Sequence, residues 1–223
     1  MDIKLFFQAI TKFLLGFVIV GCLIFLPAGT LNFVYAWLFM GLLFIPMFIV
    51  GIIMMFINPD LLRIRLNAKE KEREQKEVVA SSALMFILGF LLAGFNYRYK
   101  WIIMPKWLVI VAAIVFVIAY ILYALVLKQN TYLARTIEVL DNQKVVDTGL
   151  YGIVRHPMYA VTLLLFLSMP LILGSPISFL VFLIYPFIII KRIKNEEKVL
   201  EKDLKGYKEY EKKVKYRLIP YIW

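Results

Sequence analysis

The chain has 223 residues, of which 62% are hydrophobic and only 18% are charged. This composition excludes an ordinary soluble globular protein and indicates a polytopic membrane protein, because several apolar runs approach the ~20 residues that cross a bilayer. The net charge of +11 lies beside these runs and does not indicate a nucleic-acid partner, and one cysteine and one histidine cannot form a metal cluster.

The first half of the chain predicts four transmembrane helices, and the first is expected to be a retained span because no small-residue cleavage site follows it. The stretch Arg63–Glu77, which lies between the second and third spans, is rich in both charge signs and predicts a solvated cytosolic helix. The expected bounds of the spans are Leu5–Pro27, Leu31–Ile57, Val78–Phe95 and Trp107–Leu127.

The second half begins with a polar segment, Lys128–Arg155, that is too long and too polar to lie in lipid. Two apolar runs follow, Pro157–Leu173 and Ile177–Ile190, and the Gly-Ser-Pro turn between them predicts a helical hairpin whose second arm bends at Pro186. The lysine-rich tail carries apolar residues at helical spacing, which predicts interfacial helices interrupted at Gly206.

The expected fold is therefore all-α, with about six hydrophobic helices and interfacial helices near the C-terminus. We divide it into N-terminal transmembrane helices (1–127) and a catalytic region (128–223). Of the 26 Lys and Arg residues, only Arg98, Lys100 and Lys106 fall on one predicted side of the membrane, and the other 23 fall on the opposite side. The positive-inside rule makes that basic side cytoplasmic, so both termini and the region around His156 are expected in the cytosol.

The only histidine lies where the polar segment meets the next apolar run. Gly149 and Gly152 allow sharp turns before it, and Pro157 suits the first turn of a helix. A helix start attracts anions through its unpaired amides, so Arg155, His156 and their neighbours predict a site for a small anionic ligand. The alternative is a membrane-interface cap whose arginine reaches toward lipid head groups.

The hairpin is expected to bring a second polar segment to the same place. His156 and Glu196 lie 19 and 21 residues from Ser175, so helical arms of about 29 and 32 Å end at one membrane face. Arg192 lies one turn before Glu196 on the same helix face. Together these groups could bind a zwitterion, with the helix amides on its carboxylate and a glutamate on its amine. The alternative is a surface Arg–Glu pair of little energetic value.

These residues form an ordered set of motifs that resembles the isoprenylcysteine carboxyl methyltransferase family. The resemblance is strongest from about Asn130 to Trp223, and the N-terminal half matches mainly as membrane spans. Val161, where the family often has glycine, and Asn96, where bacterial relatives carry aspartate, depart from the pattern. The motifs are Gly149-x-Tyr151-x-x-x-Arg155-His156-Pro157-x-Tyr159, Arg192-x-x-x-Glu196-Glu197, Gly206-Tyr207-x-x-Tyr210 and Arg217-x-x-Pro220.

The resemblance implies an integral membrane methyltransferase that uses S-adenosylmethionine, with the cofactor at the cytosolic ends of the last helices. It also implies a lipid-like or prenylcysteine-like acceptor that enters from the bilayer, with Arg192 as the catalytic residue that orients its carboxylate. The residues that the resemblance places at the cofactor are Gln143, Lys144, Val145, Val146, Tyr151, His156, Pro157, Met158, Tyr159 and Glu196.

Methyl transfer to an ionised carboxylate needs no strong base, because alignment of the two reactants can remove ~7–11 kcal/mol of the barrier. For an amine or thiol acceptor, Glu197 is the candidate base. We expect Glu197 to matter less than Glu196 for cofactor binding, because consecutive helical side chains point about 100° apart.

Three rival functions stay open. A phospholipid N-methyltransferase also pairs a glycine-containing turn with Glu-Glu. A reductase related to sterol C14 reductases would bind NADPH, but the chain shows no dedicated basic cluster for a 2′-phosphate. A non-enzymatic lipid-binding or transport protein is the third, although the spans carry almost none of the charge that marks ion paths. The sequence identifies neither the acceptor nor the oligomeric state.

Overall fold

The computed structural model describes residues 3–67, 73–133, 139–140 and 142–223, and all regular structure in them is helical. The predicted all-α class is therefore confirmed. In chain order the helices are α1 (Ile3–Ala28), α2 (Val34–Ile57), α3 (Pro59–Leu66), α4 (Arg73–Tyr99), α5 (Lys106–Gln129), the 3₁₀ turn η1 (Gly149–Gly152), α6 (Pro157–Ile172), α7 (Pro176–Phe182), α8 (Tyr185–Asp203) and α9 (Tyr207–Lys213).

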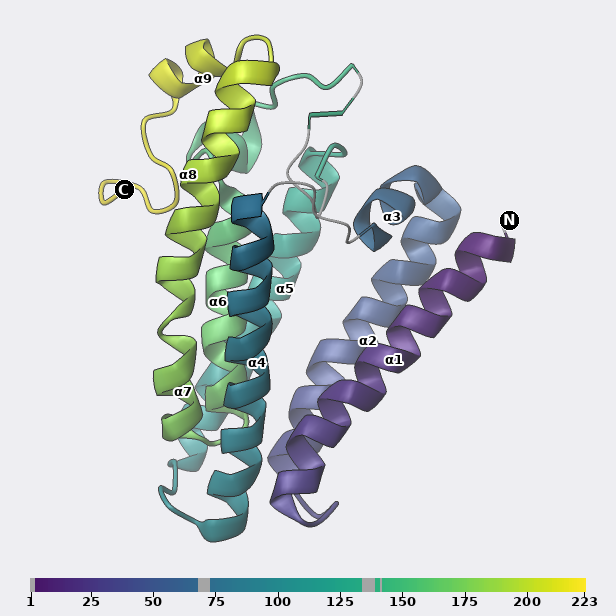
Figure 1. The fold of residues 1–223 in the computed structure, drawn as a ribbon, viewed down its shortest axis with the longest axis vertical. Coiled ribbons are helices and arrows are strands. Elements are labelled where there is room, and N and C mark those ends of the chain that lie inside the picture. Colours follow the sequence, from purple (N-terminus) through teal and green to yellow (C-terminus); the bar gives the residue numbers. More distant parts are fainter. Residues whose placement is uncertain (1–2, 68–72, 134–138, 141) are drawn as a thin grey trace.

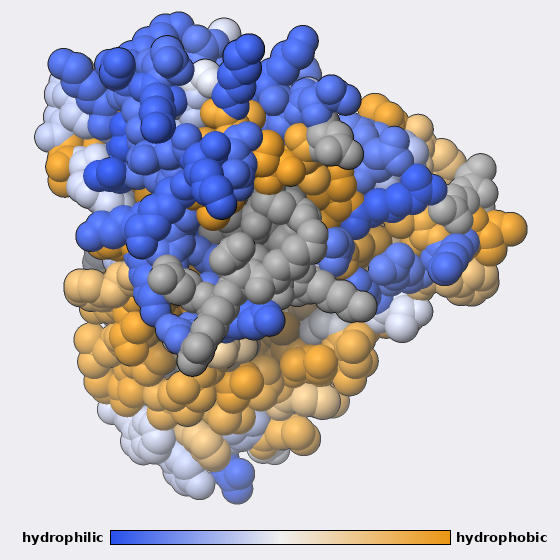
Figure 2. All heavy atoms as spheres, turned by 45° about the horizontal axis from the view of Figure 1, so that its top comes forward, coloured by the Kyte–Doolittle hydropathy of each residue, from blue (hydrophilic) through white to orange (hydrophobic). Residues whose placement is uncertain are grey.

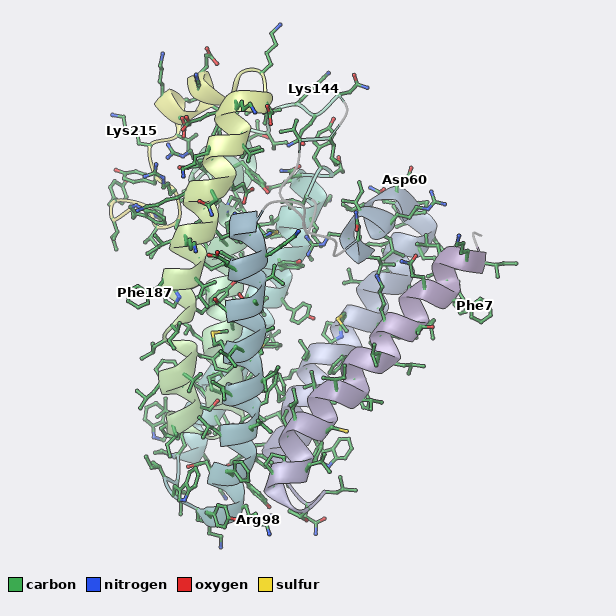
Figure 3. All side chains as sticks on the ribbon, viewed as in Figure 1. Phe7, Asp60, Arg98, Lys144, Phe187 and Lys215 are labelled. Carbon is green, nitrogen blue, oxygen red and sulfur yellow. The ribbon has the colours of Figure 1, made fainter. Side chains whose placement is uncertain are left out.

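The predicted hydrophobic runs correspond to helices of the structure. Five helical stretches among the described residues are long and apolar enough to cross a membrane: α1, α2, α4, α5 and the combined stretch of α7 and α8. The remaining predicted run, Pro157–Leu173, forms α6, which is apolar but has only 16 residues. Large apolar side chains such as Phe7 and Phe187 are 63% and 72% exposed and point away from the helices (Figure 3). Such exposure is expected where lipid rather than water surrounds the helix.

The helices form two groups that meet along α4. α1 and α2 run together and lean away from α4, α5, α6, α7 and α8 toward the polar end of the molecule, as Figure 1 shows. α4 approaches its neighbours closely at two glycines. A Cβ on Gly94 would lie 2.5 Å from the Ile24 carbonyl oxygen of α1, and one on Gly89 would lie 2.2 Å from the Phe182 ring of α7. Small residues at these points let the helices pack together without a hydrophobic driving force from water.

The predicted hairpin is confirmed, and its second arm bends as expected. Gly174 takes the left-handed conformation at the turn (φ 68°), and Ser175 caps α7 by accepting from the Ser178 N–H at 3.2 Å. The second arm is broken between α7 and α8, next to Pro186, because proline has no N–H for the helical ladder. The arm is longer than the predicted run that ends at Ile190, since α8 continues to Asp203 in a charged, amphipathic extension.

The prediction of one solvated helix over Arg63–Glu77 is wrong for the residues that the structure describes there. α3 ends at Leu66 and α4 begins at Arg73, and residues 68–72 lie outside the described part of the chain. Gln75 is 1% exposed, and the Arg65 guanidinium donates to the Tyr123 hydroxyl. These side chains reach polar partners inside the protein, which a count of charges in the sequence does not reveal.

The start of α1, the C-terminus, α3, α9 and residues 142–148 before η1 lie toward one end of the molecule (Figure 1). Figure 2 shows hydrophilic side chains gathered at this end above a predominantly hydrophobic body. Asp60, Lys144 and Lys215 lie there, whereas Arg98 lies at the opposite end (Figure 3). We call the first of these ends the polar end.

The concentration of basic residues at the polar end leads to a topology prediction. A reporter fused after Trp223 is expected to be cytoplasmic, and a tag inserted after Ile103, in the turn between α4 and α5, is expected on the opposite side. Protease protection of both tags in intact cells checks this assignment. A cytoplasmic tag after Ile103 would contradict it.

Candidate active site

A cavity at the polar end, here called the polar cavity, lies between the start of α6, α8, α9 and the loop before α6. Ten of the eleven site residues expected from the sequence line it: Gln143, Lys144, Val145, Val146, Tyr151, His156, Met158, Tyr159, Arg192 and Glu196. Its other lining residues among those described are Asn130, Tyr132, Leu133, Arg155, Leu200, Leu204, Tyr207 and Tyr210.

Pro157 is the expected site residue that the structure places elsewhere. It begins α6, but its side chain lines a separate apolar groove beside Leu218 and Pro220. Because consecutive helical residues point about 100° apart, His156 and Met158 face the polar cavity while the proline between them faces away. It starts the helix, and its contact with a cofactor stays a prediction that its place in the apolar groove does not support.

The backbone amides at the start of α6 are less available to a ligand than the sequence suggests. The N–H groups of Arg155 and His156 donate to carbonyl oxygens of the C-terminal tail at 2.8 and 2.9 Å. The N–H of Tyr159 donates to the His156 carbonyl oxygen at 3.1 Å. Side chains, rather than the helix amides, therefore provide most of the polar groups in the cavity.

Three of those side chains form a connected group across the hairpin. The Tyr159 hydroxyl of α6 donates to Glu196 of α8, and Arg192 Nε donates to the same hydroxyl at 2.8 Å. The Arg192 guanidinium also contacts the Gln75 side-chain oxygen of α4 at 3.3 Å. An anionic and a cationic group are thus held one helical turn apart, with a tyrosine between them, as the register of the hairpin predicts.

Next to this group lies a buried ionic cluster centred on Glu197, whose side chain is 3% exposed. One of its carboxylate oxygens accepts from Arg155 Nε at 2.9 Å and lies 3.1 Å from His156 Nε2. The other oxygen accepts from Arg217 Nε at 2.6 Å. Glu197 does not line the polar cavity, and its two oxygens are already held by basic side chains. This placement argues against the base role considered for it from the sequence.

The Glu197 cluster holds the C-terminal tail against the start of α6. Arg155 contributes most, because its Nη1 also donates to the Val214 carbonyl oxygen at 3.2 Å and its Nη2 lies 3.6 Å from Glu211. Gly206, at φ 89°, separates α8 from α9, which confirms the predicted interruption of the tail. The chain therefore turns back over the cavity instead of continuing along α8.

The loop before α6 is fixed at the end that leads into η1 and α6. At Gly149 (φ 59°) a Cβ would lie 2.6 Å from the Gln129 side chain, which itself accepts from the Leu150 N–H at 3.0 Å. Asp147 pairs with Lys213 of α9 at 2.6 Å, and this hydrogen bond and charge lower the pKa of Asp147. These contacts place the part of the loop that carries Val145 and Val146 against the polar cavity.

A second cavity, here called the apolar cavity, lies between α2, α3, α5 and α6. It encloses about 330 Å³ and is lined mainly by aliphatic and aromatic side chains, together with the polar groups of Arg65, Tyr120, Tyr123 and Thr162. Thr162 lies one turn after Met158 on α6, so the apolar cavity begins close to where the polar cavity ends. The helix α6 thus contributes to both.

Sequence reasoning missed several residues that shape the site. Tyr207 and Tyr210 belong to one of the motifs but were not expected in the cavity. Their helical spacing with Leu200 and Leu204 was the sequence signal that places them on the same side of the tail. Arg65 and Gln75 gave no signal, since each stands in a run of charged residues. The central position of Glu197 was also missed, because adjacent glutamates look equivalent until the helix packs.

The fold and the site define a polytopic helical membrane protein with a polar cavity at one end of its last helices. The model of the isoprenylcysteine carboxyl methyltransferase (ICMT) family matches residues 97–202. The resemblance inferred from the motifs is thereby confirmed for this part of the chain, which runs from the end of α4 to the end of α8. The match supports a membrane methyltransferase.

The chain is also similar to Delta(14)-sterol reductase TM7SF2 of Mus musculus. The two are 31% identical over 91 residues, which are 40% of this chain and 22% of the reductase. The chain thus spans about a fifth of the length of this curated relative.

Proposed function

We propose that this chain is an integral membrane methyltransferase that uses S-adenosylmethionine to methylate the carboxylate of a lipid-like or prenylcysteine-like acceptor. The observation that carries the proposal is the group formed by Arg192, Tyr159 and Glu196 in the polar cavity, next to an apolar cavity within the membrane-spanning helices. A polar cofactor and a lipophilic acceptor require neighbouring sites of this kind. The match to a methyltransferase family supports the same assignment.

Glu196 and Tyr207 are the side chains best suited to the cofactor. Glu196 lines the polar cavity, and a carboxylate that accepts from Tyr159 has further lone pairs for an amine or a ribose hydroxyl. The Tyr207 hydroxyl is buried and has no hydrogen-bond partner among the described residues, so it can bind a ligand oxygen. The enclosed part of the polar cavity is only about 90 Å³, so a nucleoside-sized cofactor would extend from it along the loop that carries Val145 and Val146.

Bound S-adenosylmethionine supplies an activated methyl group, and the protein supplies alignment. Arg192 is held by Tyr159 and Gln75, so its planar guanidinium has a fixed direction in which to orient an acceptor carboxylate. The acceptor oxygen is already nucleophilic when ionised, so no residue has to remove a proton. The surrounding apolar helices exclude water and strengthen these contacts.

Calorimetry with purified protein tests the cofactor site. Glu196→Gln is expected to weaken S-adenosylmethionine binding by about 10- to 100-fold, because a charge-assisted hydrogen bond contributes about 1.5–3 kcal/mol. Glu201→Gln, an exposed acid on the same helix, is the matched control and should bind as the wild type does. Equal binding by wild type and Glu196→Gln would remove Glu196 from the site.

The similarity to a sterol reductase makes reduction the second candidate function. The same calorimetric experiment with NADPH in place of S-adenosylmethionine separates the two. We expect binding of S-adenosylmethionine and none of NADPH. The opposite pattern would contradict the proposed methyltransferase and favour the reductase.

A further inference from the structure

Arg65 is a basic residue of the apolar cavity, and the proposed reaction gives it no role so far. It lies on α3 and is one of the residues that line the apolar cavity. Its Nη2 donates to the Tyr123 hydroxyl, and its Nη1 lies 3.8 Å from the Met158 sulfur. Met158 lines the polar cavity and precedes Tyr159 in α6. The Arg65 guanidinium therefore lies where the apolar cavity approaches the polar one.

The partners of Arg65 do not neutralise its charge. Tyr123 and Met158 are uncharged, and the guanidinium carbon lies 5.5 Å from the Tyr123 ring centroid. Within the described part of the chain, no carboxylate forms an ion pair with Arg65. A cation at an apolar wall is costly unless an anion binds beside it, so this position favours a negatively charged ligand.

The other polar groups of the apolar cavity are already used within the protein. The Tyr120 hydroxyl donates to the Leu43 carbonyl oxygen at 3.0 Å, and the Thr162 hydroxyl donates to the Tyr159 carbonyl oxygen at 3.1 Å. Among the described residues, the cavity thus offers a largely apolar surface with one positive charge, that of Arg65. This is the complement of a single-chain amphiphile that carries an anionic head group.

We propose that Arg65 binds the carboxylate of the methyl acceptor while the acceptor's chain occupies the apolar cavity, and that it thereby distinguishes the acid from the ester product. The inference rests on the proposed function. Methylation joins the methyl carbon to a carboxylate oxygen while its bond to the donor sulfur breaks. The sulfonium and the carboxylate both lose their charges, and no proton is transferred. The neutral ester no longer pairs with Arg65, so it leaves for the bilayer.

This role differs from that of Arg192. Arg192 lines the polar cavity and is held by Tyr159, so its loss should lower the turnover number. Arg65 lines the apolar cavity and acts on the bound acid, so its loss should raise KM for the acid with a smaller effect on turnover at saturation.

The test compares an acid with its own methyl ester. The probes are an N-acetylated, S-prenylated cysteine and the corresponding methyl ester, and binding is measured in nanodiscs of zwitterionic lipid. Because the two probes partition differently into lipid, the acid-to-ester affinity ratio is compared between variants. We expect Arg65→Gln to lower this ratio by about tenfold through weaker acid binding, with ester binding unchanged. The acid-to-ester ratio of Arg65→Lys should lie between those of the wild type and Arg65→Gln, since lysine keeps the charge but not the planar guanidinium.

Gly51→Leu is the matched control for the apolar part of the cavity. Gly51 lines the apolar cavity, and a Cβ there would meet no heavy atom within 4 Å, so a larger side chain can start at this position without a backbone clash. It should weaken the binding of acid and ester alike and leave their ratio unchanged. This outcome would separate recognition of the chain from recognition of the head group.

An unchanged acid-to-ester affinity ratio in Arg65→Gln, whether both affinities fall equally or neither falls, would overturn the proposal. An unfolding temperature of Arg65→Gln equal to that of the wild type would exclude a general loss of structure as the cause. The experiment contains no methyl donor, so it is independent of the proposed activity. If the wild-type protein fails to bind S-adenosylmethionine but Arg65 still discriminates acid from ester, the methyltransferase proposal fails and the amphiphile site stands.

Discussion

Arg192→Lys is expected to lose turnover on a carboxylate acceptor by about 100-fold at saturating cofactor, because small errors in alignment have effects of this size. Arg192 Nε donates to the Tyr159 hydroxyl at 2.8 Å, and Nη1 lies 3.3 Å from Gln75. The single ammonium of lysine cannot keep both contacts and also bind the two oxygens of a carboxylate. Cofactor affinity, measured by calorimetry, should stay near that of the wild type.

Lys191→Gln is the control for this substitution. Lys191 is the neighbouring cation, exposed, and paired with Glu77 at 2.8 Å on the surface. Its loss should leave turnover unchanged. Full methyl transfer by a stably folded Arg192→Lys protein would exclude the carboxylate clamp and favour an amine acceptor, as in a phospholipid N-methyltransferase.

Glu197→Gln is expected to have the largest effect on stability, about 3–5 kcal/mol, since it leaves the charge of a buried partner uncompensated. The Arg155 side chain is 7% exposed, and after the substitution its remaining carboxylate neighbour is Glu211 at 3.6 Å. The tail that carries Arg217 would also lose its attachment to α8. In thermal unfolding followed by tryptophan fluorescence, Tm should fall by on the order of 10 °C.

Glu196→Gln provides the comparison for this prediction, because it makes the same chemical change one residue earlier on α8. It should lower cofactor affinity with little change in Tm, whereas Glu197→Gln should lower Tm strongly. If the two variants unfold at the same temperature, the buried cluster does not hold the tail in place.

The sequence predicted the residues of the polar cavity better than those of the apolar cavity. Hairpin arms of nearly equal length were enough to bring His156 and Glu196 to one end of the molecule, and both line the polar cavity. The direct partner of His156 is nevertheless Glu197, whereas Glu196 accepts from Tyr159, because rotation of α8 about its axis decides which residue each glutamate reaches. The length of a helix along its axis follows from its number of residues. Its rotation about that axis is decided only by packing against other helices.

The division of the chain at residues 127 and 128 stays a prediction, as does the cytoplasmic location of the polar end. The described helices of the two regions pack together, because α5 packs along α6 and α4 against α7. Arg65 and Gln75 come from the N-terminal region and contact Met158 and Arg192 of the C-terminal region in the folded protein. The two cavities are therefore lined by residues from both sides of the predicted boundary.

By itself the sequence determined the membrane-spanning helices, the concentration of charge at the polar end and the motif residues around the polar cavity. Apolar runs, proline and glycine act locally, so their effect can be judged from neighbouring residues alone. Only the tertiary structure decided that Pro157 faces away from the cavity, that Glu197 is a buried ionic centre and that Arg65 reaches the apolar cavity. Each of these depends on the direction of a side chain toward a segment distant in sequence, and that direction is fixed by how the helices pack.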